Sequence, residues 1–171
     1  MINRIFLVGY MGSGKTTIGA ALSKKLGFEF IDTDIYIENR FHKSINDIFA
    51  TMGEEKFRQI ETNILNEVSD FENVIISTGG GTPCFNNNME VMKEKGIVVF
   101  LNPDLDELTY RLNLVKVTRP LIKDKTEEEM RGFIEKMLTS RIPFYSQAHI
   151  TTSGDLEHGA EEILQFLIPN S

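Results

Sequence analysis

The segment from Gly9 to Thr16 reads Gly-Tyr-Met-Gly-Ser-Gly-Lys-Thr and matches the pattern G-x-x-x-x-G-K-[ST]. An apolar run, Arg4–Val8, precedes it, and a helical pattern, Lys15–Leu26, follows it until Gly27. Glycines at these places let successive backbone N–H groups curve around phosphate oxygens, and the start of a helix adds partial positive charge. A glycine-rich turn that only joined the strand to the helix would leave the lysine and the threonine unexplained. The segment therefore predicts a phosphate-binding loop.

Apolar runs alternate with helical patterns along the rest of the chain, which favours an α/β domain with a mainly parallel sheet. The further strands are expected at Phe28–Ile31, Val74–Ser77, Ile97–Leu101 and, as a short edge strand, Ile150–Thr152. The further helices are expected at 45–52, 57–68, Met89–Lys95, Leu105–Leu112, Glu127 to about Pro143, and Leu156–Leu167. The segment Val115–Lys125 carries several cations and shows no clean period, so it is predicted to be a surface loop that no apolar pattern ties to the core.

The composition fits one soluble domain. The chain has 171 residues, of which 41% are hydrophobic and 25% charged, and Cys84 is its only cysteine, so no intrachain disulfide can form. The first apolar run is too short for a signal peptide and no apolar stretch reaches membrane-spanning length, so we expect a cytoplasmic protein. The net charge of -7 argues against a nucleic-acid partner. It also requires that any phosphate site be built from local cations and backbone N–H groups.

Two further segments follow predicted strands and should face the same crevice, because ligands gather beyond the carboxyl ends of parallel strands. Asp32-Thr33-Asp34 follows the second strand and Gly79-Gly80-Gly81 follows the third. One aspartate can lie near the shell of a Mg²⁺ ion while the other accepts a proton from an attacking hydroxyl. Alternatively, Asp32 or Thr33 caps the next helix, and spacing alone leaves both readings open. The glycines permit close approach by a ligand or form a flexible turn.

Two arginines are candidates for binding a carboxylate, because the planar guanidinium matches a carboxylate with two parallel hydrogen bonds. They are Arg58 and Arg141. Glu61 lies three residues after Arg58 on the same predicted helix and could hold it in position. An arginine on a helix is more often solvated surface, so this assignment needs support from elsewhere. The D-x-x-G and N-K-x-D elements of GTPase switches are absent from the sequence.

Taken together, these motifs resemble the shikimate kinase family over essentially the whole chain. The motifs that carry the resemblance are Gly9 to Thr17, Asp32-Thr33-Asp34, Phe57-Arg58 with Glu61, Ser77 to Gly81, Arg119-Pro120-Leu121, and Arg141 to Tyr145. The resemblance implies that the ATP phosphates are held by Gly12, Ser13, Gly14, Lys15, Thr16, Thr17 and Arg119. It places Mg²⁺ at Thr16 and, through water, at Asp32. It implies an acceptor site made of Asp34, Arg58, Gly79, Gly80, Gly81 and Arg141, with Lys15, Asp34 and Arg119 as the catalytic set.

The same resemblance implies a reaction and an architecture. The reaction moves the γ-phosphoryl group of ATP to the 3-hydroxyl of shikimate, a step toward chorismate and the aromatic amino acids. The fold implied is one three-layer P-loop kinase domain over residues 1–171, with a five-stranded parallel sheet, a mobile lid at about 115–125 and an acceptor-binding helical region at about 33–62. ATP and shikimate would be the only partners of a monomer, without nucleic acid or membrane.

The sequence departs from the family in two places, and it leaves other activities open. The stretch Ser146 to His149 lacks the acidic residues that many relatives carry, and no basic residue stands near Ser153, so contacts to adenine are not assigned. The nearest alternative is another small-molecule P-loop kinase, such as a gluconate-type sugar-acid kinase or a nucleoside monophosphate kinase. A nucleotide-binding regulatory module without turnover is a third reading.

Overall fold

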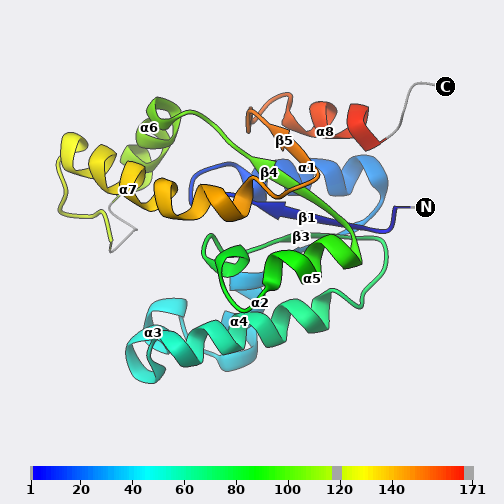
Figure 1. Ribbon diagram of the computed structural model, residues 1–171, viewed down its shortest axis with the longest axis horizontal. Helices are drawn as coiled ribbons and strands as arrows, with labels where there is room; N and C mark the ends of the chain where they lie inside the picture. The colour runs from blue at the N-terminus through cyan, green and yellow to red at the C-terminus, as the bar shows by residue number, and fades with distance from the viewer. Residues whose placement is uncertain (1, 117–120, 168–171) are drawn as a thin grey trace.

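Five parallel strands form the sheet of the computed structural model, which describes residues 2–116 and 121–167 (Figure 1). Their spatial order is β2-β3-β1-β4-β5. They are β1 (Arg4–Val8), β2 (Glu29–Asp32), β3 (Val74–Ser77), β4 (Ile97–Leu101) and β5 (Ile150–Thr152). All four pairings are parallel, so the carboxyl ends of the strands meet at one edge of the sheet. The predicted strands are confirmed, except that the second begins and ends one residue later than expected.

Helices cover both faces of the sheet (Figure 1). The helical elements are α1 (Lys15–Leu26), α2 (Thr33–Phe41), α3 (Ile45–Met52), α4 (Glu54–Val68), the 3₁₀ turn η1 (Thr82–Cys84), α5 (Asn88–Lys95), α6 (Leu105–Val115), α7 (Glu127–Tyr145) and α8 (Gly159–Leu167). Helices α1 and α8 pack together on one face, whereas α4, α5 and the end of α7 contribute to the core on the other. None of the described helices is long and apolar enough to cross a membrane.

The alternation of side chains along β1 explains why both faces need helices. Ile5 and Leu7 pack against residues of α1 and α8, whereas Phe6 and Val8 pack against residues of α4 and α5. All four side chains are fully buried. Covering both faces removes this apolar surface from water.

A third apolar cluster joins the phosphate-binding loop to α6 and α7. It consists of Tyr10, Leu108, Leu112, Ile122, Met130 and Ile134. Ile122 is fully buried there, so the segment 115–125 is tied to the core at this point. The sequence shows no apolar period that ties this segment to the core, because the contact rests on a single buried side chain.

The apolar pattern did not predict α2 as a separate helix, and the bounds of α4, α5, α6, α7 and α8 differ from those expected. Helix α2 begins at Thr33, directly after the strand, because the Asp32 side chain accepts hydrogen bonds from the backbone N–H groups of Asp34 and Ile35. Helix α7 passes through Pro143 and ends at Tyr145. A proline so close to the end of a helix disturbs only its last turn, where few hydrogen bonds remain to be lost. Helix α8 begins at Gly159, later than the apolar pattern suggested.

Candidate active site

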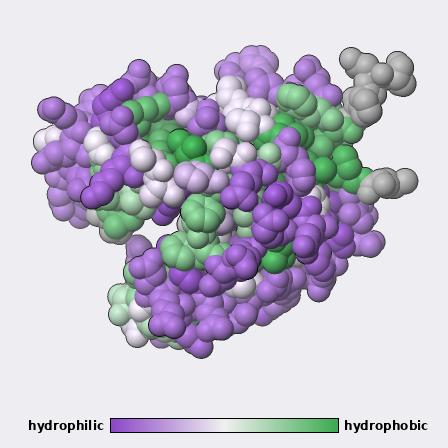
Figure 2. Space-filling view, viewed as in Figure 1, coloured by the Kyte–Doolittle hydropathy of each residue, from purple (hydrophilic) through white to green (hydrophobic). Residues whose placement is uncertain are grey.

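Two cavities lie side by side at the carboxyl edge of the sheet. The phosphate cavity, of ≈ 370 Å³, is lined by Met11, Gly12, Gly14, Lys15, Thr16, Thr17, Asp32, Asp34, Ser77, Thr78, Gly80, Arg111, Leu114, Val115 and Leu156. The arginine cavity, of ≈ 400 Å³, is lined by Tyr10, Met11, Asp34, Ile45, Asn46, Phe49, Ala50, Phe57, Arg58, Glu61, Gly79, Gly80, Gly81, Leu121, Phe133, Met137 and Arg141. Figure 2 shows the surface indented between the α6–α7 pair and α3. Met11, Asp34 and Gly80 line both cavities, so the two are adjacent and share these residues.

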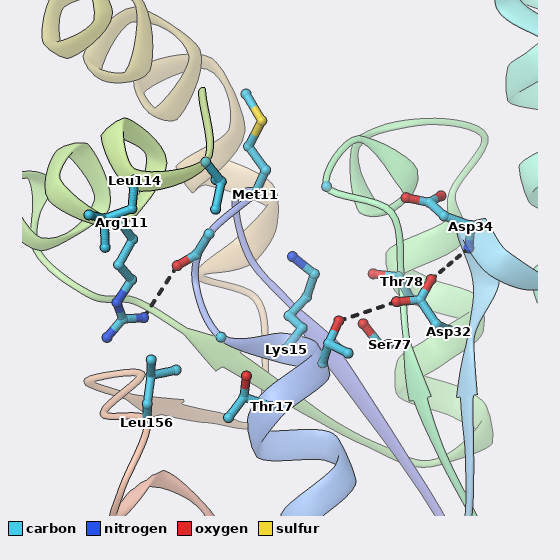
Figure 3. Close-up of a pocket in the computed structure, with 15 residues that line it drawn as sticks. Met11, Lys15, Thr17, Asp32, Asp34, Ser77, Thr78, Arg111, Leu114 and Leu156 are labelled. Atoms are coloured by element: carbon cyan, nitrogen blue, oxygen red, sulfur yellow. Dashed lines mark hydrogen bonds between the residues drawn. The ribbon is translucent and has the colours of Figure 1, made fainter. Parts of the chain in front are cut away.

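The phosphate-binding loop takes the backbone shape that its glycines permit. Gly12 and Gly14 have φ angles of 79° and 100°, in the left-handed region, and Gly14 caps the start of α1. The Lys15 ammonium group donates to the carbonyl oxygens of Gly9 at 2.8 Å and Tyr10 at 3.0 Å. In Figure 3 the Lys15 side chain lies in the middle of the cavity, between the loop and the two aspartates. A cation in this position faces the oxygens of any phosphate that the loop holds.

Asp32 caps α2 and also contacts the phosphate-binding loop. Its Oδ1 atom accepts a hydrogen bond at 3.0 Å from the backbone N–H of Asp34 and so caps α2, while its Oδ2 atom lies 3.4 Å from the Thr16 hydroxyl (Figure 3). The described residues hold no group of three or more His, Cys, Asp or Glu side chains placed to bind a metal ion together. One hydroxyl and one carboxylate suit Mg²⁺, which keeps several waters and binds substrate phosphates instead of a complete protein cage.

Asp34 occupies the first turn of α2 instead of an extended segment. It lines both cavities, whereas Asp32 lines only the phosphate cavity. Burial, followed by the nearby Asp32 and Glu61 carboxylates, raises the pKa of Asp34 to about 6, and Lys15 partly opposes this shift. A carboxylate with such a pKa can accept a proton near neutral pH.

The three glycines after β3 leave room for three charged side chains. A Cβ atom would lie 2.9 Å from Asp34 Oδ1 at Gly79, 3.0 Å from Arg141 Nη1 at Gly80, and 2.6 Å from Arg58 Nη1 at Gly81. None of the three has a positive φ angle. Glycine is therefore needed at these positions because of the limited space, since the Cβ atom of an alanine would crowd one charged side chain of the site.

Arg58 is held in place by its helix neighbour, as the spacing suggested. Its Nη1 atom lies 2.7 Å from Glu61 Oε2, and the two side chains are 14% and 4% exposed. Thr82 donates a hydrogen bond at 2.8 Å to the other oxygen of the Glu61 carboxylate. An ion pair with this little exposure is screened less than a surface pair and fixes the guanidinium more firmly. The solvated-surface reading of Arg58 is therefore wrong.

Arg141 reaches the arginine cavity from α7. Its guanidinium carbon lies 5.5 Å from the centroid of the Tyr10 ring. One turn further along the helix, the Tyr145 hydroxyl donates a hydrogen bond to the carbonyl oxygen of Gly80. The continuation of α7 beyond Pro143 makes this contact possible. Two guanidinium groups and the carboxylates of Asp34 and Glu61 thus line a single cavity.

Arg111 of α6 is a site residue that the sequence analysis missed. Its guanidinium donates to the carbonyl oxygen of Gly12 at 3.2 Å (Figure 3). It also donates to the carbonyl oxygen of Gly154 at 3.0 Å, and its Nε atom pairs with Glu107 at 2.6 Å. The only signal in the sequence is the pair with Glu107 four residues earlier, which is a common feature of exposed helices. Arg119, expected at the nucleotide phosphates, lies outside the described residues.

Comparison with known proteins separates the families that share this fold. A family model described as shikimate kinase matches residues 11–169. The chain belongs to the shikimate kinase family. A shikimate kinase of Parabacteroides distasonis is 55% identical over 150 residues, which cover 88% of this chain and 87% of the relative. One of Bacteroides thetaiotaomicron is 51% identical over 152 residues, covering 89% and 87%.

Solved structures agree with this membership. The crystal structure of the shikimate kinase from Bacteroides thetaiotaomicron has a TM-score of 0.94 and 46% identity, covering 98% of this chain and 99% of the other. The shikimate kinase from Acinetobacter baumannii, solved in complex with shikimate, has a TM-score of 0.87 and 36% identity, covering 98% and 93%. A gluconokinase from Sinorhizobium meliloti has a TM-score of 0.60 at 19% identity, so this similarity concerns the fold alone. The five-stranded P-loop kinase fold expected of the chain is confirmed.

Proposed function

We propose that the chain transfers the γ-phosphoryl group of ATP to the 3-hydroxyl of shikimate, giving shikimate 3-phosphate and ADP. The observation that carries this proposal is the adjacency of the two cavities, which share Asp34 and Gly80. A phosphate chain in the phosphate cavity and a ring acid in the arginine cavity would meet beside the Asp34 carboxylate. Such an arrangement would bring a hydroxyl and a phosphoryl group together, and this positioning supplies most of the catalysis in phosphoryl transfer.

The arginine cavity suits a small carboxylic acid. Arg58 and Arg141 approach it from α4 and α7, next to Gly81 and Gly80, and both present guanidinium groups that can pair with one carboxylate. Asp34, on the side shared with the phosphate cavity, would accept hydrogen bonds from ring hydroxyls. This separation between a carboxylate-binding end and a hydroxyl-binding end supports shikimate as the acceptor.

In the nucleotide half of the proposal, Gly12, Ser13, Gly14, Lys15, Thr16 and Thr17 bind the phosphates of ATP. Thr16 and, through water, Asp32 hold Mg²⁺, which would neutralise the charge that develops on the transferred group. Lys15 donates to phosphate oxygens once these replace its present backbone carbonyl partners. Asp34 orients the attacking hydroxyl and takes its proton, a role that its raised pKa favours.

The segment 115–125 is proposed to close over both substrates and to bring Arg119 to the nucleotide. Val115 lines the phosphate cavity and Leu121 lines the arginine cavity, so the described ends of the segment border one substrate site each. Closure would exclude water, which competes with the acceptor for the phosphoryl group. Slower amide exchange across 115–125 with ATP analogue plus shikimate, compared with the free protein, is the expected result; unchanged exchange would remove closure from the proposal.

The experiment that tests the function is an assay of ADP release with shikimate, gluconate or a nucleoside monophosphate as acceptor. We expect turnover with shikimate and background rates with the other two. Turnover with gluconate in preference would identify the gluconate-type alternative. Nucleotide binding without turnover on any acceptor would identify a regulatory module.

A further inference from the structure

Arg58 stands between two hollows of the surface. On its inner side is the arginine cavity, and on its outer side is an open groove of ≈ 750 Å³, here called the outer groove, which is lined by Glu54, Glu55, Arg58, Gln59, Thr62, Asn63, Phe85 and Asn86. A long arginine side chain on a helix can adopt many rotamers. A guanidinium that turned into the outer groove would be lost to an acceptor in the inner cavity, so the affinity of the site depends on what keeps Arg58 in place.

The ring of Phe85 lies on the guanidinium of Arg58. The guanidinium carbon is 4.2 Å from the centroid of this half-buried ring, which is closer than its 5.5 Å to the ring of Phe57. At such a distance the negative face of the ring attracts the cation. Phe85 also lines the outer groove, so its ring lies beside the path that the guanidinium would take outward.

Thr82 acts on the same guanidinium through Glu61. Its hydroxyl donates to Glu61 Oε1 at 2.8 Å, which leaves Glu61 Oε2 to pair with Arg58 at 2.7 Å. The two oxygens of one buried carboxylate are thus divided between a neutral donor and the guanidinium. Without the threonine donor, the carboxylate could turn and the ion pair would lose its fixed direction.

The segment that supplies Thr82 and Phe85 is itself attached to α4. The Asn86 side-chain amide donates to the carbonyl oxygen of Arg58 at 3.4 Å and to the Thr62 hydroxyl at 3.0 Å. Asn86 has a φ angle of 50°, in the left-handed region that asparagine tolerates better than most residues. The chain after the three glycines therefore returns to the helix turn that carries Arg58 and places the ring over it.

We propose that Phe85 and Thr82 are positioning residues that fix the Arg58 guanidinium toward the arginine cavity and thereby set the affinity for the carboxylate of the acceptor. The inference rests on the proposed function, since it takes shikimate as the acceptor. Holding a binding group in its bound conformation before the ligand arrives lowers the entropy that binding must overcome. The effect should appear in acceptor binding and not in ATP binding.

The test compares Phe85→Leu with Phe85→Tyr. Leucine keeps an apolar side chain but has no ring face, whereas tyrosine keeps the ring. For Phe85→Leu we expect the dissociation constant of shikimate to rise about three- to tenfold, the range of a partly desolvated cation–ring contact. The dissociation constant of ATP and kcat at saturating shikimate should change by less than about twofold.

Two variants serve as controls. Phe85→Tyr keeps the ring and should bind shikimate almost normally. Phe71→Leu makes the same replacement at a phenylalanine that lies outside the site and is 38% exposed.

A second measurement isolates the carboxylate. The ratio of affinities for shikimate and its methyl ester should fall in Phe85→Leu, because a loosely held guanidinium discriminates less between an anion and a neutral ester. Thr82→Val should act in the same direction and Thr82→Ser should not, since serine keeps the hydroxyl donor. An unchanged ratio in both Phe85→Leu and Thr82→Val, or equal losses for ATP and shikimate, would overturn the inference. Absence of shikimate turnover in the unmodified protein would instead overturn the proposed function.

Discussion

The hydroxyl of Tyr145 donates a hydrogen bond to the carbonyl oxygen of Gly80, so the last turn of α7 is attached to the wall that both cavities share. Tyr145 is fully buried, and burial raises the pKa of its hydroxyl, so this group stays a protonated donor at any pH of interest. The contact joins the helix that carries Arg141 to the glycine that Arg141 approaches. Helix α7 thus has a fixed position relative to the acceptor site.

Tyr145→Phe removes this hydrogen bond and leaves the ring in place. We expect a loss of about 1 kcal/mol in the free energy of unfolding, measured in urea, because one buried hydrogen bond is broken. The KM for shikimate should rise by up to about fivefold, the factor that corresponds to the same free energy. Tyr110→Phe is the control, since that tyrosine is 62% exposed and its variant should match the parent in both measurements.

Gly81→Ala should impair acceptor binding specifically. The added methyl group would lie 2.6 Å from Arg58 Nη1, so the guanidinium must move. If one charge-assisted hydrogen bond to the carboxylate of shikimate is lost, we expect the KM for shikimate to rise about ten- to a hundredfold, with little change in the KM for ATP.

The matched control for that change is Gly132→Ala, on an exposed part of α7 where a Cβ atom meets nothing within 4 Å. Alanine is favoured over glycine inside a helix by about 0.5–1 kcal/mol, so this variant should be slightly more stable and fully active. Normal shikimate kinetics in Gly81→Ala would show that the close approach to Arg58 is not needed.

The sequence predicted the strands and the phosphate-binding loop because their signals are local. An apolar run, a glycine pattern and a helix start stand next to one another at Arg4 to Lys15. The purpose of the three glycines could not be read in this way, since the need for space at Gly81 arises from Arg58, on another element. The role of Arg111 depends likewise on the carbonyl oxygens of Gly12 and Gly154.

Asp32 shows a different limit. Its capping of α2 and its contact with Thr16 use different oxygens of one carboxylate, so the cap is compatible with the proposed role beside Mg²⁺. Spacing along the chain says which residue types are present at a strand end. It does not say which atoms of one side chain face which neighbour, because this depends on the path of the helix that follows.

Lys15→Met should abolish most phosphoryl transfer. Removal of a positive charge aimed at the transferred group typically lowers the rate by a hundredfold or more, about 3 kcal/mol. Since the Lys15 ammonium also donates to the carbonyl oxygens of Gly9 and Tyr10, the variant needs a check by circular dichroism that its fold is intact. Near-normal turnover by a folded Lys15→Met protein would be inconsistent with the proposed nucleotide site.

Asp32→Asn should change the dependence on magnesium and leave the helix cap intact. Asparagine caps a helix about as well as aspartate, so the bonds to the N–H groups of Asp34 and Ile35 can persist. The lost negative charge lies beside the Thr16 hydroxyl. We expect the magnesium concentration for half-maximal activity to rise about ten- to a hundredfold, as for other outer-shell ligands. A magnesium titration that matches the parent would assign Asp32 to capping alone.

Asp34 should limit both the pH range of activity and the stability of the fold. With a pKa raised to about 6, the carboxyl group of the free protein is protonated below that pH, so kcat/KM for shikimate should fall as the pH is lowered through about 6.

The same group affects stability. In the unfolded chain the pKa of Asp34 is near 3.8, so between this value and 6 the folded state binds more protons than the unfolded state. Stability contributed by this group is therefore present at low pH and is lost as the pH rises to about 6. The loss is on the order of 2–3 kcal/mol for a shift of this size. Asp34→Asn should thus be nearly inactive yet more stable than the parent at pH 8, and the difference should shrink toward pH 4. Urea unfolding of both proteins at pH 4, 6 and 8 measures this. If the variant were less stable than the parent at pH 8, the ionised Asp34 carboxylate would not destabilise the folded protein.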